Sequence, residues 1–337
     1  MLKLKSCSPS RIKTYDMCKF KYFLTYNCPG LKLKSNWGAA HGSLLHDILE
    51  NYANGVDNDW MSRLYRGYAG KLETLDRHGK PETMETPLVW AKTKDYHEKR
   101  PHCDTCPYAD RATQSCHISG EKLNALTGCP KGLFDGSVTM LESTIKRYSD
   151  GIWSKMLRDA NGVPIGTEYP FNIKIAGADV PLIGIMDLVI EEDADTIHII
   201  DYKTGVWVQN YAECREDIQV KIYSMAARKE FIEDVNKKGY KYKNIMLTFD
   251  YFTSNPITLA FTADEDAATE RYTADKIHEI ESTTWIDRIV RSNEEFAERK
   301  AWKCRSLCDT EVCVSRWKGR FNADAAIEAE TNAERSE

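Results

Sequence analysis

Two short apolar segments of this chain end in aspartates, and a lysine follows the second one. The first reads Gly-Ile-Met-Asp and ends at Asp187; the second reads Ile-Ile-Asp-Tyr-Lys-Thr-Gly and contains Asp201 and Lys203. A turn is expected near Ala194, so the aspartates would face each other in an antiparallel hairpin, with Cβ atoms about 5 Å apart. Strand side chains alternate, so Lys203 shares a face with Asp201. This set predicts a site that holds a divalent cation and a phosphate oxygen and cuts phosphodiester bonds.

Paired acids need a reason to lie side by side, because without a cation their charges repel. Asp187 and Asp201 could instead be ordinary acids that close strands and cap turns. We favour a metal site, and carboxylate oxygens prefer hard ions, which indicates Mg²⁺ or Mn²⁺ rather than zinc. His46 could supply a further ligand from a helix whose other side is apolar, although a histidine in such a place is more often structural.

Further residues could support this chemistry. Lys203 would stabilise the charge that develops on the phosphate and orient the attacking water, unless it is a plain surface lysine. Glu168, ahead of the strand pair, is either a third acid that contacts metal-bound water or a surface residue. Gln219 and Tyr223 are four residues apart, so they share one helix face and could touch a DNA backbone or the water around the metal.

Hydrophobic periodicity predicts helices that flank a small mixed sheet. Strand patterns occupy about 164–175, 181–191, 196–203, 244–253 and 256–262. Helix patterns run from Ser8 through Phe23, over 38–52, less clearly to about Tyr96, and then over 137–148, 211–233 and 264–293. These elements indicate an α/β class, with α+β as the near alternative, in which helices pack on the sheet.

Composition and charge are those of an ordinary globular protein without a membrane span. The net charge is −5, and no apolar run approaches the roughly 20 residues that cross a bilayer. No signal-peptide core follows Met1, so we expect a cytoplasmic protein. Over residues 1–34 eight lysines and arginines accompany a single acid, Asp16. This basic segment could follow a phosphate backbone, or it could be a solvated face.

Four motifs, in this order, resemble the RecB-like branch of the PD-(D/E)xK nucleases. They read Gly-Ser-Leu-Leu-His at 42–46, Gly-Ile-Met-Asp at 184–187, Asp-Tyr-Lys-Thr-Gly at 201–205 and Gln-Val-Lys-Ile-Tyr at 219–223. Each is short, but their combination over about 38–260 is specific. The resemblance implies a restriction-endonuclease-like core with Lys203 as catalytic lysine and Gln219 and Tyr223 in support. It also implies these metal ligands: His46, Asp187, Asp201 and the carbonyl of Tyr202.

Eleven cysteines, an odd number, fit disulfides poorly in a reducing compartment. One early and three late cysteines are similar to those of the iron–sulfur exonucleases related to the CRISPR-associated four-cysteine nucleases and the AddB nuclease domain. That similarity implies a 4Fe-4S cluster on Cys18, Cys304, Cys308 and Cys313. Three residues separate the first late pair, where the commoner spacing is two. Cys7 and Cys28 are alternative early ligands, and free thiols or zinc are alternatives to a cluster.

A second cysteine group lies in a segment that lacks hydrophobic periodicity and that the main family pattern does not predict. Four thiols there suit tetrahedral zinc: Cys103, Cys106, Cys116 and Cys129. His102 or His117 could replace one ligand, and free thiols or a second iron–sulfur site are alternatives. We favour a structural zinc that positions a DNA strand.

The chain accordingly divides into five expected regions. A helical region over 1–97 carries Cys18 and His46, and a cysteine-rich metal-binding insertion spans 98–133. The nuclease core spans 134–300, a C-terminal cysteine cluster 301–320, and a disordered acidic tail 321–337.

The resemblance implies a metal-dependent DNA exonuclease in replication, recombination or repair, or in the same work for a phage. Its substrate would be single-stranded DNA or a DNA end, and a helicase, recombinase or integrase could be its partner. No Walker-type phosphate loop occurs, so we expect no helicase motor in this sequence. The competing function is a non-catalytic DNA-binding, CRISPR-adaptation or assembly subunit that retains the nuclease fold. A structure-specific endonuclease would differ only in its product.

Overall fold

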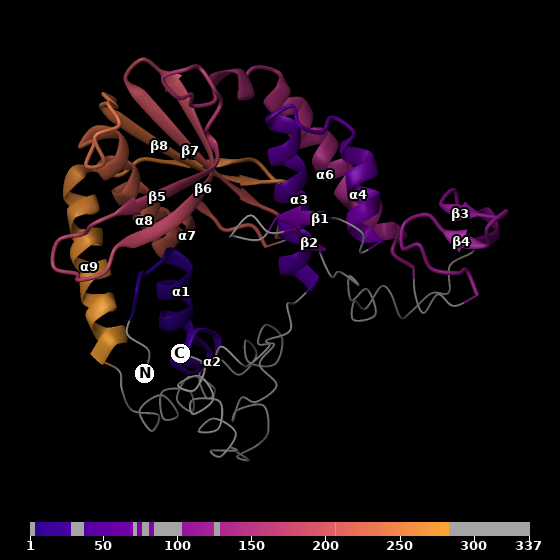
Figure 1. Ribbon diagram of the computed structural model, residues 1–337, viewed down its shortest axis with the longest axis horizontal. Helices are drawn as coiled ribbons and strands as arrows, with labels where there is room; N and C mark the ends of the chain where they lie inside the picture. Colours follow the sequence, from indigo (N-terminus) through magenta and orange to yellow (C-terminus); the bar gives the residue numbers. More distant parts are fainter. Residues whose placement is uncertain are drawn as a thin grey trace, which may run out of the picture.

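A five-stranded mixed sheet lies at the centre of the computed structural model, which describes residues 4–27, 37–69, 73–75, 81–83, 103–124, 129–205 and 207–282 (Figure 1). Its strands, in spatial order, are β5 (Thr167–Ile173), β6 (Leu182–Asp193), β7 (Thr196–Lys203), β8 (Asn244–Tyr251) and β9 (Ile257–Leu259). Only the β7–β8 pairing within this sheet is parallel. The predicted α/β class with a small mixed sheet is confirmed, and each strand falls on a predicted segment.

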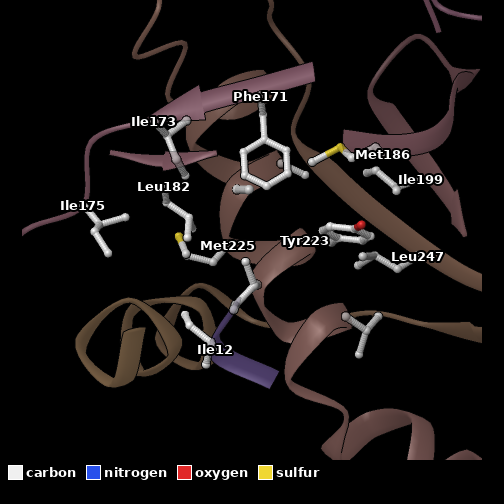
Figure 2. Close-up of a cluster of buried hydrophobic side chains, with 14 of the residues drawn as sticks. Ile12, Phe171, Ile173, Ile175, Leu182, Met186, Ile199, Tyr223, Met225 and Leu247 are labelled. Carbon is white, nitrogen blue, oxygen red and sulfur yellow. The ribbon is translucent and has the colours of Figure 1, made fainter. Parts of the chain in front are cut away.

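Helices cover the sheet on both faces (Figure 1). One layer contains α1 (Pro9–Met17), α8 (Ile218–Ala227) and α9 (Ala263–Ser282), and the other contains α3 (Trp37–Ala53), α4 (Trp60–Tyr68) and α6 (Lys131–Ser149). Each helical layer packs on the sheet and forms a separate cluster of buried hydrophobic side chains with it. Figure 2 shows the first, where Ile12 and Met225 pack on strand residues such as Leu182. Leu45 and Leu141 belong to the second.

The sheet departs from regular alternation beside the predicted acids. On β7, Ile199 and Ile200 belong to opposite clusters, as neighbours on a strand should. On β6, however, Met186 belongs to the first cluster and Leu188 to the second, although residues two apart normally share a face. The break falls at Asp187.

Two expected helices are interrupted by side chains that cap new ones. Cys18 is extended (φ −162°, ψ 110°) between α1 and α2 (Lys19–Tyr26), and its sulfur accepts from the Lys21 amide. The predicted helix over 211–233 divides into α7 (Tyr211–Glu216), α8 and the π-helical η4 (Arg228–Ile232). Its first break is at Asp217, whose carboxylate accepts from the Gln219 amide. Both predictions of one continuous helix were therefore wrong, because a side-chain cap competes with helical continuity.

Smaller elements differ from the prediction in extent. The helical pattern expected up to Tyr96 gives way to a hairpin of β1 (Glu73–Leu75) and β2 (Pro81–Thr83), while 84–96 lie outside the described residues. Helix α6 begins at Lys131, six residues earlier than expected, and α9 is described to Ser282. The insertion contains η2 (Cys103–Thr105), β3 (Ala109–Asp110) and β4 (Ser115–Cys116), and η3 (Trp153–Lys155) follows α6.

The expected C-terminal regions and the expected absence of a membrane span can be compared with the structure only where residues are described. The C-terminal cysteine cluster at 301–320 and the acidic tail at 321–337 lie outside the described residues. Among the described helices, none combines the length and apolar character required to cross a bilayer.

Gly184 of the Gly-Ile-Met-Asp motif makes a close contact that can be tested. It lies opposite Phe171 of β5, and a Cβ atom added to Gly184 would overlap the Phe171 ring. We expect Gly184→Ala to lower the free energy of unfolding by about 1–3 kcal/mol, measured by urea denaturation. The matched control is Gly136→Ala on α6, where the new methyl meets nothing within 4 Å and should not destabilise. Equal stabilities of the two variants would contradict this role of Gly184.

Candidate active site

Three acidic side chains lie in a row across three adjacent strands: Glu168 on β5, Asp187 on β6 and Asp201 on β7. The row follows from the register, because Leu188 is paired with Thr167 of β5 and with Ile200 of β7. One position earlier on β6, the same register places Asp187 between Glu168 and Asp201. The predicted antiparallel hairpin, with its turn at 194–195, is thus confirmed.

Glu168 was expected only ahead of the strand pair, and the structure places it within the row. It has a left-handed backbone (φ 44°) at the second residue of β5, a conformation that costs energy for a residue other than glycine. A sequence signal could have located it. Glu168 and Asp187 are symmetric about the turn at 177–178, and Gly177 has the positive φ that this turn requires (82°).

His46 reaches the acids from the helical layer on one face of the sheet. Its Nδ1 atom lies 3.7 Å from Asp187 Oδ2 and 4.0 Å from Glu168 Oε1. Among the residues described, these three form the group whose possible metal-binding atoms all lie within 4.8 Å of one another. The described cysteines of the insertion do not meet that spacing. His46 therefore joins two carboxylates in a candidate cation site.

A close helix approach positions His46. Gly42, one turn earlier on α3, faces the segment that follows the Asp-Tyr-Lys strand, and a Cβ atom at Gly42 would lie 2.9 Å from Thr204 Oγ1. The His46 ring also packs edge-on against Tyr202, with ring centroids 5.7 Å apart. These contacts place the first sequence motif directly against the third.

Lys203 is held beside Asp201 by contacts from three directions. Its Nζ atom forms an ion pair with Asp201 Oδ2 and donates to Gln219 Oε1 at 3.4 Å. The same ammonium lies 4.5 Å from the centre of the Phe249 ring, a favourable cation–π contact. Burial alone would lower the pKa of Lys203, but the charge and hydrogen bond of Asp201, together with the charges of Asp187 and Asp217, outweigh burial, and the net pKa is raised. Lys203 is therefore a cation at neutral pH.

Gln219 and Tyr223 reach the site from the opposite helical layer and share the predicted helix face. Gln219 Nε2 donates to Asp201 Oδ1 and to Tyr223 Oη, both at 3.1 Å. The Tyr223 hydroxyl donates to the Ile185 carbonyl at 2.8 Å, and its ring lies in the core (Figure 2). Gln219 thus contacts Asp201, and Tyr223, which is buried, contacts the backbone near the start of β6. The contacts of both residues with DNA or with water around a metal stay predictions.

Crowding shifts the pKa values of the acids in one direction. Burial, and then the charge of Asp201, raises the pKa of Asp187 well above its usual range, although the Tyr202 amide donates to it at 2.8 Å. Burial, and then Asp187, raises the pKa of Glu168 to about 7. Burial lowers the pKa of His46 despite nearby acids and a hydrogen bond to the Tyr202 backbone. Neutral imidazole is the form that binds a metal ion.

The donor set fits a hard divalent cation. Two carboxylates and one imidazole converge, and oxygen-rich sites of this kind suit Mg²⁺ or Mn²⁺. A cation would also stabilise the charged forms of Glu168 and Asp187, whose pKa values are raised by burial and then by neighbouring charges. Asp201 lies in the same row but is engaged by Lys203 and Gln219, so its role as a ligand stays a prediction, as does that of the Tyr202 carbonyl.

The predicted iron–sulfur ligands are only partly covered. Cys18 lies at the junction of α1 and α2, whereas Cys28 and the three late cysteines, Cys304, Cys308 and Cys313, lie outside the described residues. Cys7 is fully buried, and burial raises the pKa of its thiol to about 11, which disfavours the thiolate that a cluster needs. The cluster assignment stays a prediction.

Glu168 should make the stability of the metal-free protein depend on pH. Its pKa is 4.5 ordinarily and about 7 in the fold, so the folded state binds the proton more tightly. The resulting stabilisation is fully present below about pH 4.5 and is lost as the pH rises through about 7. Because the side chain is 35% exposed, solvent screening reduces the effect to about 1–2 kcal/mol.

Urea denaturation in EDTA, across this pH range, tests the expectation. Glu168→Gln should remove the decline in stability, whereas Glu142→Gln, on the exposed face of α6, should retain the wild-type profile. Identical profiles for wild type and Glu168→Gln would show that this carboxyl does not titrate as the geometry indicates.

Comparison with known proteins agrees with this geometry. The family model of the PD-(D/E)XK nuclease superfamily matches residues 6–84 and 118–313 and passes over 85–117, a stretch that includes the first part of the insertion. One subunit of an ATP-dependent helicase/deoxyribonuclease from Clostridium tetani is 26% identical over 251 residues. That alignment covers 71% of this chain but 19% of the relative, so the chain spans about a fifth of the relative's length.

Among solved structures, a candidate exonuclease from Eubacterium rectale is similar at 11% identity and a TM-score of 0.39, over 87% of this chain and 82% of the other. The family assignment does not depend on this resemblance, since the family model covers most of the chain, including all four motifs that surround the acids. The chain belongs to the PD-(D/E)XK nuclease superfamily.

Proposed function

We propose that this protein is a metal-dependent DNA exonuclease. The observation that carries the proposal is the convergence of His46, Glu168 and Asp187 beside the Asp201–Lys203 ion pair. A purely structural protein would gain nothing from three crowded carboxylates, two of which have pKa values raised by burial and mutual repulsion. A bound cation would stabilise the crowded carboxylates, and the lysine would bind an anionic substrate.

His46, Glu168 and Asp187 would hold the Mg²⁺ or Mn²⁺ ion, with Asp201 and the Tyr202 carbonyl as the further ligands expected from sequence. When bound, such an ion polarises the scissile phosphate and lowers the pKa of a bound water molecule. The remaining work falls to side chains of this chain.

Lys203 stabilises the negative charge that develops on the phosphate oxygens and orients the attacking water. It is pre-oriented, because Asp201, Gln219 and the Phe249 ring hold its ammonium before substrate arrives. Gln219 spans the lysine and the aspartate, so it couples their positions. Tyr223 in turn ties Gln219 to the backbone of β6.

DNA as substrate is supported by the name of the similar relative, and cleavage from an end is what the motif resemblance implies. The similar Clostridium tetani protein is part of a helicase/deoxyribonuclease. By analogy, this chain would degrade single-stranded DNA or DNA ends in replication, recombination or repair, with a helicase, recombinase or integrase as partner. We further propose the 4Fe-4S cluster on Cys18, Cys304, Cys308 and Cys313, which iron and sulfide analysis after anaerobic purification would test.

Lys203 provides the sharpest test of the proposed chemistry. Lys203→Ala should lower the rate of DNA degradation by about 10²–10³-fold, because it removes a positive charge aimed at the transition state. The assay uses end-labelled single- and double-stranded DNA with Mg²⁺, Mn²⁺ or EDTA, and EDTA should abolish the wild-type activity. DNA binding, measured in EDTA, should persist in the variant.

Lys221→Ala is the matched control, since Lys221 lies on the same helix as Gln219 but pairs with the exposed Glu216. It should degrade DNA at the wild-type rate. A wild-type protein, purified anaerobically, that binds DNA and never cuts it would instead support the non-catalytic role in DNA binding or assembly.

The mode of attack can be separated from the chemistry with circular substrates. An exonuclease should shorten linear DNA from one end and leave covalently closed single-stranded circles intact. The position of the surviving label reveals the polarity of cleavage. Opening of the circles at a comparable rate, with the same dependence on Lys203, would replace the exonuclease by an endonuclease without affecting the site assignment.

A further inference from the structure

Local backbone structure links three of the four cysteines of the insertion. Cys103 begins η2 and Cys106 directly follows it, with the Cys106 amide donating to the Cys103 carbonyl at 3.2 Å. The Cys106 carbonyl then accepts from the Ala109 amide at 3.2 Å, and Ala109 pairs with Cys116 across the β3–β4 hairpin. A turn with two thiols followed by a hairpin with a third is the layout of a metal knuckle.

Cys129 joins this group from a different part of the chain. It immediately precedes Pro130, the N-cap of α6. The insertion reaches this helix through Tyr108, whose hydroxyl donates to Asp135 of α6. Cys129 and the insertion therefore meet at the start of α6. The described cysteines form no disulfide among themselves.

The module lacks the means to hold itself together by packing. Its β3–β4 hairpin has two residues in each strand, far too few to be stable alone. Two buried side chains, Cys116 and Ile118, connect it to the cluster of the α3, α4 and α6 layer. A segment of this size, rich in polar residues, normally requires a staple such as a disulfide or a metal.

Its contacts lie against the two helices at that end of the molecule (Figure 1). Tyr108 packs edge-on against Phe134 of α6 and Tyr65 of α4, with ring centroids 5.4 and 6.5 Å away. Its hydroxyl donates to Asp135 at 2.7 Å, and the Lys131 ammonium lies 5.9 Å from its ring centre. The insertion therefore packs against the first turn of α6.

We propose that Cys103, Cys106, Cys116 and Cys129 bind one structural Zn²⁺ ion that staples the insertion to the beginning of α6. Four soft thiolate ligands select zinc over the hard cations expected at the acidic site. No three of these four sulfurs, each on a described residue, lie within 4.8 Å of one another. Zinc binding would therefore draw the sulfurs together and complete the fold of the module. His117 is exposed, so the proposal assigns the four ligands to cysteines; His102 lies outside the described residues.

The staple has a consequence for the helical layer. The Ser137 hydroxyl of α6 forms hydrogen bonds of 2.7 Å with both His41 of α3 and Tyr68 of α4. Helix α3 carries His46, so a loosened start of α6 would disturb the helix that supplies this ligand. Zinc acts here as a positioning element, and its binding does not depend on the nuclease proposal.

Metal content of the full-length protein tests the inference directly. We expect about one zinc per chain by mass spectrometry of the purified protein. Cys106→Ser and Cys129→Ser should each lose it, and their melting temperatures should fall by more than about 5 °C. His117→Ala, in the same module, should retain both zinc and stability. Iron bound elsewhere would remain in all three variants.

A second measurement avoids variants that fail to fold. Wild-type protein stripped of zinc with a chelator, and titrated with Co²⁺, should develop the thiolate-to-cobalt absorption of a four-thiolate site, and excess Zn²⁺ should abolish it. Zinc-free wild-type protein that shows no such band would overturn the proposal. So would iron and sulfide that disappear with Cys106→Ser, because the module would then hold a cluster.

Discussion

Mutual repulsion among three carboxylates on adjacent strands is the constraint on which the site depends. Glu168, Asp187 and Asp201 follow one another across β5, β6 and β7, in surroundings that disfavour the charged forms of the first two. Lys203 neutralises Asp201 within the protein. The other two face a histidine that burial keeps neutral. The fold thus stores an unfavourable arrangement that a divalent cation would relieve, which is how metal sites convert local instability into affinity.

Both helical layers are needed to hold this arrangement. His46 comes from the α3 layer, and Gln219 and Tyr223 come from the α8 layer, so the sheet between them is contacted from its two faces. Close packing gives each approach its precision: Gly42 lets α3 reach Thr204, and Gly184 leaves room for the Phe171 ring. The sheet is irregular beside the site: Glu168 has a left-handed backbone, and the alternation of side chains between the two faces of β6 breaks at Asp187. Strain at such positions is tolerated where function requires it.

Local patterns predicted most elements well, and the exceptions share a cause. All five sheet strands and α3 follow from hydrophobic periodicity and turn residues, because those signals act over short distances. Cys18 and Asp217 interrupt helices whose periodicity continues past them, since each side chain caps the next amide run. Hydrophobic periodicity indicates which face of a helix is apolar, but it does not detect capping side chains. Periodicity also missed the earlier start of α6 at Lys131, because the first turn of this helix packs on the insertion.

The sequence by itself determined the chemistry of the site. Two acids symmetric about a turn, a lysine two residues on, and a glutamine and tyrosine four apart follow from the periods of strand and helix. Only the tertiary structure decided that Glu168 belongs to the row, that His46 lies against Asp187 and Glu168, and that Lys203 and Gln219 engage Asp201. These relations join segments far apart in the chain, and they depend on strand register and helix docking. No local pattern encodes such distances, because packing against the whole core sets them.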